Sequence, residues 1–279
     1  MSTETVDLKP KIGSEVHVEL DALIGGTFAG QLRTLLVARG VLVFRNLDIT
    51  LDQQRAITAT LGRLHIPANG DPLQKVTRDE KESAEYAAFF PATFFWHMDG
   101  HYHQTVPCFA ASLRPARLPA DGGGQTEFLN TYAAYDDLPG DEKRFVDALR
   151  VVHSRVATMS RVRPDATEEE AATWRRTPSA TQPLVWQHMS GRKSLMLGNS
   201  VAYVEGMHPA DSNDLLIRLR SHMMQPQYVY THEWRMNDLV LWDNTGTMHR
   251  ARPFDPNSGR LLTRFTLDGE EPIRAPAAC

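Results

Sequence analysis

The sequence predicts a mainly β protein with flanking helices, folded as a single domain over residues 1–279. The prediction depends first on the C-terminal third, where the short strand-like segments "QYVYTHEWR", "DLVLWDN", "TMHRA" and "GRLLTRFTL" follow one another. They are separated by "MND", "NTG" and "FDPNSG", and such spacing of short strands and turns is typical of a sandwich or barrel. Helical segments lie early in the chain and between the groups of strands, which indicates that they flank a β core. A β domain of 279 residues is not unusually long.

The first third of the chain contains two helix signals around one strand signal. "FAGQLRTLLVARG" has apolar residues at helical spacing and stops at Gly40, a residue that favours a helix C-terminus. The run "VLVF" at 41–44 has the composition of a buried strand. In "TLDQQRAITATLG", Thr50 and Gln53 have the spacing of a capping box, so a second helix is predicted.

Residues 65–93 have an irregular composition. They contain Pro67, Pro72 and Pro91 together with the charged run "RDEKE". We predict a long loop here, and long loops in compact domains are often lids over binding sites. The segment is therefore expected to be an active-site lid.

The middle of the chain returns to regular elements. Strands are predicted at 108–114 and 125–130, on either side of the turn-forming "DGGG". Thr167 and Glu170 form a further capping-box pattern. Three later helices are expected, at 139–149, 167–176 and 212–224.

Composition and charge exclude several classes of protein. The net charge is −4, and no block of like charges suggests a nucleic-acid surface or a membrane-binding tail. Only two cysteines are present, Cys108 and Cys279, which fits a reducing cytoplasm and is no disulfide framework. The N-terminal residues lack the apolar core of a signal peptide, and no apolar run is long enough for a membrane helix. We expect a cytoplasmic protein whose partner is a small molecule.

The stretch "FFWHMDGHYHQ" contains the first candidate metal ligands, His97 and Asp99. The alternative is a polar strand edge that is rich in histidine, because a short H-x-D pattern often arises by chance. His249, in "LWDNTGTMHRA", follows a strand and a tight turn, so it would be held firmly at the end of a hairpin. Two histidines and one carboxylate on one face are the ligand set of non-haem Fe(II) oxygenases.

Two further residues favour a site that binds a dicarboxylic acid at its metal. Arg260 lies eleven positions after His249 on a predicted core strand, and Thr126 follows "GGGQ". A buried guanidinium needs a partner, and its planar fork matches a carboxylate. A threonine hydroxyl could add a third bond. The alternative is a structural ion pair of Arg260 with one of the acidic residues Asp243, Glu127 or Asp268.

The ordered set His97-x-Asp99, Thr126, His249 and Arg260 resembles the TauD/TfdA family of Fe(II)/2-oxoglutarate-dependent dioxygenases. The resemblance includes "GVLVFRNLDITLDQQ", "WHMDG", "GGGQTEFLNTYAAYDDLP", "GRKSL" and "NDLVLWDNTGTMHRA", and runs from about residue 40 to residue 266. It implies a double-stranded β-helix (jelly-roll, cupin-like) core.

The resemblance also implies the cofactors and their ligands. Fe(II) would be held by His97, Asp99 and His249, and the far carboxylate of 2-oxoglutarate by Arg260 and Thr126. With O2, 2-oxoglutarate would be converted to succinate and CO2 while an organic substrate is oxidised, most simply by hydroxylation. Family members commonly self-associate, so a homo-oligomer (dimer or tetramer) is expected.

The residues around the metal ligands suggest the kind of substrate. In the family, the position of Arg264 helps to hold a carboxylate of the cosubstrate or an anionic group of the substrate. Pro67 stands where taurine-type members have a substrate-binding histidine, and proline cannot hold a sulfonate. Met98, Gly100 and Tyr102 give apolar or open surroundings. We therefore expect a substrate bulkier or more hydrophobic than taurine.

The neighbouring histidines leave other functions open. His101 and His103 would share a face with His97 and Asp99 if the stretch were a strand, but the chain is expected to turn at Gly100 and carry them away. A metal-dependent hydrolase or isomerase on the same scaffold, or a non-catalytic binding module, are the alternatives. Dependence on 2-oxoglutarate and oxygen would separate the first of these from a dioxygenase.

Overall fold

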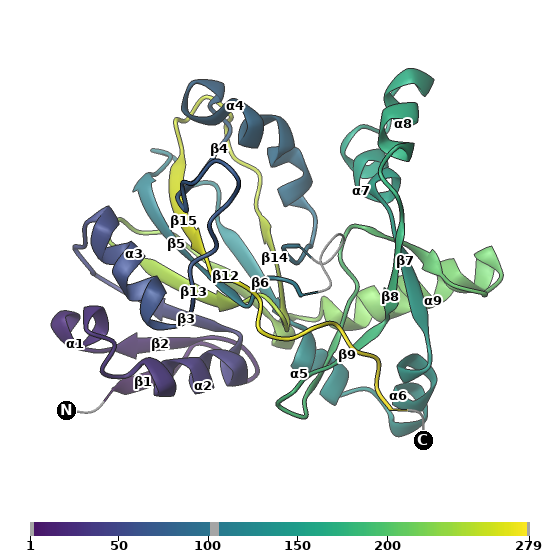
Figure 1. Cartoon of the computed structure of the whole chain (residues 1–279), viewed down its shortest axis with the longest axis horizontal. Coiled ribbons are helices and arrows are strands. Elements are labelled where there is room, and N and C mark those ends of the chain that lie inside the picture. Colours follow the sequence, from purple (N-terminus) through teal and green to yellow (C-terminus); the bar gives the residue numbers. More distant parts are fainter. Residues whose placement is uncertain (1–2, 101–105, 278–279) are drawn as a thin grey trace.

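The computed structural model describes residues 3–100 and 106–277, and these form a mixed α/β fold with several sheets. Nine α-helices, two 3-10 helices and fifteen strands lie in the described ranges (Figure 1). The strands and flanking helices are present as expected, but the helices form too large a part of the chain for it to be called mainly β. The helices in the middle of the chain are more numerous than the sequence indicated, because several are short and begin with single capping residues.

The largest sheet has seven strands in the order β1-β2-β3-β13-β5-β15-β4. Its neighbours are antiparallel, except that β2 and β3 run parallel. Strands distant in sequence are thus adjacent in space, and the last strand, β15, lies between β5 and β4. The strands are β1 (Glu4–Asp7), β2 (Ser14–His17), β3 (Val41–Phe44), β4 (Gln74–Thr77), β5 (Ala110–Arg117), β13 (Leu239–Asp243) and β15 (Leu261–Thr266).

A second sheet, in the order β12-β6-β14, packs against one face of the large sheet. The ring of Phe128 from this sheet lies 5.8 Å from the ring of Trp242 in β13. Together with apolar side chains of β3 and β5, these rings form the core between the two sheets. The strands are β6 (Thr126–Asn130), β12 (Val229–His232) and β14 (Thr247–Ala251).

The N-terminal helices cover the opposite face of the large sheet. Alternate residues of a strand point to opposite faces, so Val41 and Val43 of β3 face the second sheet while Leu42 and Phe44 face the helices. The expected helix end at Gly40 is confirmed, with φ of +75°, as is the capping box of the third helix. The helices are α1 (Leu20–Ile24), α2 (Ala29–Arg39) and α3 (Leu51–Thr60).

A large insertion between β6 and β12 forms the part of the molecule on the right of Figure 1. It has its own core and two small sheets, β11-β7-β8 and β10-β9. The three helices predicted here are confirmed as α6, α8 and α9, including the capping box of α8. Its elements are α5 (Thr131–Asp136), α6 (Gly140–Asp147), β7 (Arg150–His153), α7 (Arg155–Val162), α8 (Glu168–Arg175), β8 (Ala180–Pro183), β9 (Val185–Gln187), β10 (Lys193–Leu195), β11 (Val201–Val204), α9 (Pro209–Met223) and the 3-10 helix η2 (Pro226–Tyr228).

The prediction of an irregular loop at 65–93 is wrong. The segment contains the edge strand β4, a helix α4 (Glu80–Phe89) and the start of the 3-10 helix η1 (Phe90–Phe94). The charged run is the start of α4: the Asp79 side chain accepts a bond from the Lys81 amide at 2.9 Å, and acidic residues follow in the first turn. Acidic groups there interact favourably with the helix dipole, so the charges favour a helix at this point.

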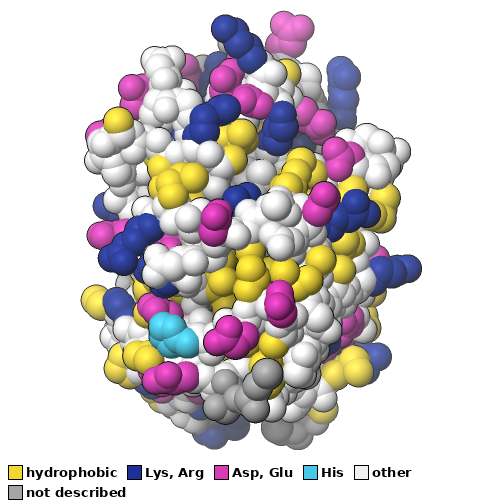
Figure 2. Space-filling model, turned by 90° about the vertical axis from the view of Figure 1, so that its left-hand side faces the viewer, with side chains coloured by type: hydrophobic (Ala, Val, Ile, Leu, Met, Phe, Trp, Pro, Cys, Tyr) yellow, Lys and Arg dark blue, Asp and Glu magenta, His cyan; other side chains and the backbone are white. Residues whose placement is uncertain are grey.

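Two observations concern the surface and membranes. On the side of the molecule that lies to the left in Figure 1, Lys and Arg side chains are interspersed with Asp and Glu, and apolar side chains lie between them (Figure 2). Among the described residues, no helix is both long enough and apolar enough to cross a membrane.

Candidate metal centre and cosubstrate site

His97 and His249 are brought together by a short antiparallel bridge between two segments. The amide of His97 donates to the carbonyl of His249 at 3.1 Å, and the amide of His249 donates to the carbonyl of His97 at 2.9 Å. Their imidazole rings lie 4.2 Å apart between centroids. His249 is in β14, whereas His97 lies just after η1 and outside any strand, so the alternative of a histidine-rich strand edge does not hold.

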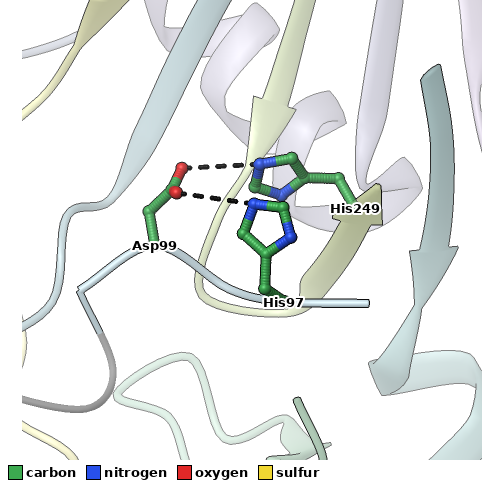
Figure 3. A group of neighbouring side chains, drawn as sticks. All are labelled: His97, Asp99 and His249. Carbon is green, nitrogen blue, oxygen red and sulfur yellow. Dashed lines mark ion pairs between the residues drawn. The ribbon is translucent and has the colours of Figure 1, made fainter. Parts of the chain in front are cut away.

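The carboxylate of Asp99 completes the group (Figure 3). Its Oδ1 lies 3.9 Å from Nε2 of His97, and its Oδ2 lies 3.6 Å from Nε2 of His249. The three ligand atoms all lie within 4.8 Å of one another. A metal ion can bind between them, and two imidazoles with one carboxylate leave further positions open for other ligands.

The tautomer of His97 is suited to metal binding. Its Nδ1 lies 2.8 Å from the carbonyl oxygen of Phe95, and because a carbonyl can only accept, Nδ1 carries the proton. Nε2 therefore presents its lone pair toward Asp99 and His249. Burial lowers the pKa of His97, which favours the neutral, ligating form.

Asn244 fixes the backbone of Asp99, a role that the sequence reasoning missed. The Asp99 amide donates to Oδ1 of Asn244 at 2.8 Å, and Nδ2 of Asn244 donates to the Asp99 carbonyl at 2.9 Å and to the Cys108 carbonyl at 3.1 Å. Asn244 begins the turn between β13 and β14. Those strands belong to different sheets, so the predicted hairpin is wrong and the turn connects the two sheets at the metal centre.

The chain turns at Gly100 as expected, with φ of +76°. This left-handed conformation is one that glycine adopts without strain. His101, Tyr102 and His103 lie outside the described residues.

Arg264 contacts the metal-binding group directly. Its Nη2 lies 2.9 Å from Oδ2 of Asp99, and its Nε donates to the hydroxyl of Thr266 at 3.1 Å. The guanidinium thus lies beside the place where a metal and an anionic ligand would meet.

Arg260 lies immediately before β15 and is 2% exposed. Its Nη2 donates to the carbonyl of Gly124 at 2.8 Å, while Nε and Nη1 are buried with no hydrogen-bond partner among the described residues. The three acidic residues considered as partners are engaged elsewhere: Glu127 with Arg250, Asp268 with Arg63, and Asp243 with Thr245.

Arg260 explains why a glycine stands at position 124, shortly before β6. A Cβ at this position would lie 2.6 Å from Nε of Arg260, and its φ of +78° also disfavours any side chain. Glycine is therefore required for the close approach of Arg260 to the backbone.

Thr126 lies at the start of β6 and lines one small cavity together with His97, His249 and Arg264. The indole N–H of Trp234 donates to its hydroxyl oxygen at 3.0 Å. Since that oxygen already accepts a bond, its own hydrogen is available to an acceptor in the cavity.

A second, larger cavity of about 830 Å³ also adjoins the metal-binding group and shares His97 and Arg264 with the first. Asp99, Gly100 and Arg264 line it, together with much of segment 65–93. Met98 does not: it is buried in the core of the inserted part, because its side chain points away from those of its two neighbours. This position argues against a direct contact of Met98 with substrate.

The fold and the His-Asp-His group together define a class of enzyme with one metal ion bound by two histidines and a carboxylate. Residues 4–266 match the family model described as "Taurine catabolism dioxygenase TauD, TfdA family". The chain belongs to this family and is an α-ketoglutarate-dependent dioxygenase, an oxidoreductase. A hydrolase or isomerase is therefore no longer an alternative.

Relatives of known activity cover nearly the whole chain. It is 33% identical to the α-ketoglutarate-dependent 2,4-dichlorophenoxyacetate dioxygenase of Cupriavidus pinatubonensis, over 95% of this chain and 98% of that protein. It is 29% identical to the (S)-phenoxypropionate/α-ketoglutarate-dioxygenase of Sphingobium herbicidovorans, over 90% and 94%. The crystal structure of AAD-2 in complex with Mn(II) and N-oxalylglycine has a TM-score of 0.80 at 29% identity, covering 98% of this chain and 100% of that one.

Proposed function

We propose that the protein is an Fe(II)/2-oxoglutarate-dependent dioxygenase that hydroxylates an organic substrate bulkier and more hydrophobic than taurine. The observation that carries this proposal is the buried Arg260, whose two nitrogen atoms Nε and Nη1 have no hydrogen-bond partner among the described residues. A carboxylate is the acceptor that its planar fork fits best. The core of the two facing sheets would then be the double-stranded β-helix of the family, and the chain a single domain.

The chain's own residues would divide the work as follows. His97, Asp99 and His249 would hold Fe(II), which supplies the oxygen chemistry when bound. Arg260 and Thr126 would hold the far carboxylate of 2-oxoglutarate, and Arg264 would hold its near carboxylate or an anionic group of the substrate. The complex of the similar AAD-2 with Mn(II) and N-oxalylglycine, an amide analogue of 2-oxoglutarate, supports the binding of a metal ion and a dicarboxylate by this fold.

The substrate class is supported by the larger cavity. A volume of about 830 Å³ is in the range of sites for drug-sized ligands, whereas taurine is much smaller. Its lining combines the apolar side chains of Leu73, Phe89 and Val106 with several acidic residues, and its cations Lys75 and Arg264 are paired with Glu82 and Asp99. The apolar lining suits an aromatic or alicyclic body, and the phenoxy-acid relatives point to the same chemistry.

Segment 65–93 is proposed to close over that substrate. Helix α4 contributes no buried residue to the core and is interrupted at Ser83, whose φ and ψ are −163° and 96°. A helix with so few buried contacts can open at low cost. Limited proteolysis should slow when substrate and 2-oxoglutarate are both present, and cleavage at an equal rate would contradict the closure.

The test of the reaction is succinate formation with Fe(II), 2-oxoglutarate and oxygen. The panel would contain taurine, phenoxyacetates, phenoxypropionates, sulfate esters and alicyclic acids, with Asp99→Ala as the inactive control. Strong stimulation by one bulky class is expected. Stimulation by taurine alone would contradict the substrate class, and no succinate above the control would contradict the reaction.

A further inference from the structure

Two arginines of the inserted part lie side by side. Arg161 is in the last turn of α7 and Arg220 in the last turn of α9. Each places an Nη2 atom near the same carbonyl oxygen, that of Val201, at 3.4 and 3.3 Å. Arg161 also donates to the carbonyls of Ala157 and Asn199, both at 2.5 Å. The two guanidinium groups therefore share one small region of space.

No carboxylate of the described chain balances these two charges. Burial, with a smaller contribution from the charge of Arg161, lowers the pKa of Arg220 to about 10, and no acidic group acts in the opposite direction. Burial also lowers the pKa of Arg161. Arg161 is exposed and Arg220 is half-buried, both remain cations at neutral pH, and their hydrogen-bond partners in the described chain are backbone carbonyls. An anion between them would reduce the repulsion of the two like charges and accept charge-assisted hydrogen bonds.

A cavity of about 140 Å³ lies beside both guanidinium groups. A cavity of roughly 150 Å³ holds one benzene ring, so this cavity accommodates an apolar body of about that size. Methionine side chains form much of its wall, and they adapt to ligands of varied shape. Its apolar lining consists of Phe95, Trp96, Leu197, Met223, Met224 and Met248.

This cavity is separate from the larger one at the metal centre. The two have no lining residue in common. Two of its lining residues, Trp96 and Met248, immediately precede the metal ligands His97 and His249 in the chain. The Trp96 carbonyl accepts a bond from the Asn199 amide at 2.8 Å, so the cavity wall is tied to the segment that positions His97.

We propose that this cavity is a second, non-catalytic binding site for a small organic anion, a carboxylate or sulfonate with an apolar body. The anionic group binds between Arg161 and Arg220, and the apolar body lies among the methionines and Trp96. A dicarboxylate such as 2-oxoglutarate fits poorly, because its second charge would lie among apolar side chains without a partner. The inference does not depend on the substrate of the metal centre.

The first experiment measures binding of phenylacetate and benzenesulfonate by calorimetry. The proteins are the wild type, Arg161→Met/Arg220→Met, and the control Arg175→Met/Arg218→Met, which removes two exposed, ion-paired arginines of α8 and α9. Loss of two charge-assisted contacts should weaken binding at least about tenfold in the first variant only. Equal affinity in all three proteins would place the probes at the metal centre alone and overturn the proposal, as would no binding to the wild type.

A second variant tests the charge balance even if the double substitution prevents folding. Met224 lines the cavity and is 45% exposed, so Met224→Glu can place a carboxylate beside the two arginines. We expect its Tm to rise by about 2–4 °C at low salt, and binding of both probes to be lost. Met236→Glu is the matched control, at 49% exposure elsewhere on the surface. A Tm no higher than that of the control, with probe binding intact, would contradict the proposal.

Discussion

Asn244 holds the peptide groups on both sides of Asp99, accepting from its amide at 2.8 Å and donating to its carbonyl at 2.9 Å. A ligand carboxylate on an irregular segment would otherwise lack a fixed backbone, since Asp99 lies outside any strand. Asn244 is itself completely buried in the turn that joins the two packed sheets. The position of the carboxylate is thus determined by the junction of the sheets.

Asn244→Ala should weaken metal binding by about 10–100-fold, the range found when residues that orient metal ligands are replaced. Titration of the apoprotein with Mn(II) measures this directly. Asn257→Ala, on an exposed turn, is the control and should bind like the wild type. Unchanged metal affinity in Asn244→Ala would show that the two bonds do not position Asp99.

Gly124→Ala should impair cosubstrate binding. The new Cβ would lie 2.6 Å from Nε of Arg260, so the guanidinium must move. We expect the KM for 2-oxoglutarate to rise by at least about tenfold, corresponding to one charge-assisted bond lost. Gly122→Ala is a close control, because its φ of +73° is similar and nothing lies within 4 Å of its Cβ. An equal effect of both substitutions would mean that backbone strain, and not Arg260, is responsible.

Trp234→Phe should remove the indole donor from the hydroxyl of Thr126. The hydroxyl is then free to rotate away from the cosubstrate, and the loss of one neutral hydrogen bond corresponds to an increase of about 2–10-fold in the KM for 2-oxoglutarate. The kcat with saturating cosubstrate should change little. Trp174→Phe, in α8, is the control. A lower kcat with an unchanged KM would contradict the assigned role.

His153 should make the protein less stable in acid. Burial lowers its pKa to about 4, so the folded state keeps it neutral while the unfolded chain, with a pKa near 6.5, binds a proton. The contribution of the neutral His153 to the free energy of unfolding is complete above about pH 6.5 and is lost as the pH falls toward 4. From pH 7.5 to 5 the loss is about 2 kcal/mol.

Urea unfolding of His153→Gln at these two pH values checks the prediction. The free energy of unfolding of this variant should fall by about 2 kcal/mol less than that of the wild type between pH 7.5 and 5. His17→Gln, on the surface, should follow the wild type. An identical pH dependence in all three proteins would exclude His153 as the cause.

Local signals were sufficient for much of the fold and for the identity of the metal ligands. The capping boxes at Thr50 and Thr167 and the glycine end at Gly40 depend only on neighbouring residues, and all three are present in the structure. His97, Asp99 and His249 were recognisable because ligand chemistry restricts which residue types can stand there. Helix α4 was missed, because three prolines in segment 65–93 outweighed the cap at Asp79.

The sequence by itself determined which residues are suited to the chemistry, whereas only the tertiary structure decided how they meet. Nothing local indicates that β13 and β14 enter different sheets, that Asn244 reaches Asp99, or that Gly124 makes room for Arg260. These contacts join residues more than a hundred positions apart. Strand pairing over such separations is selected by the packing of the whole core, so its geometry cannot be obtained from the spacing of residues along the chain.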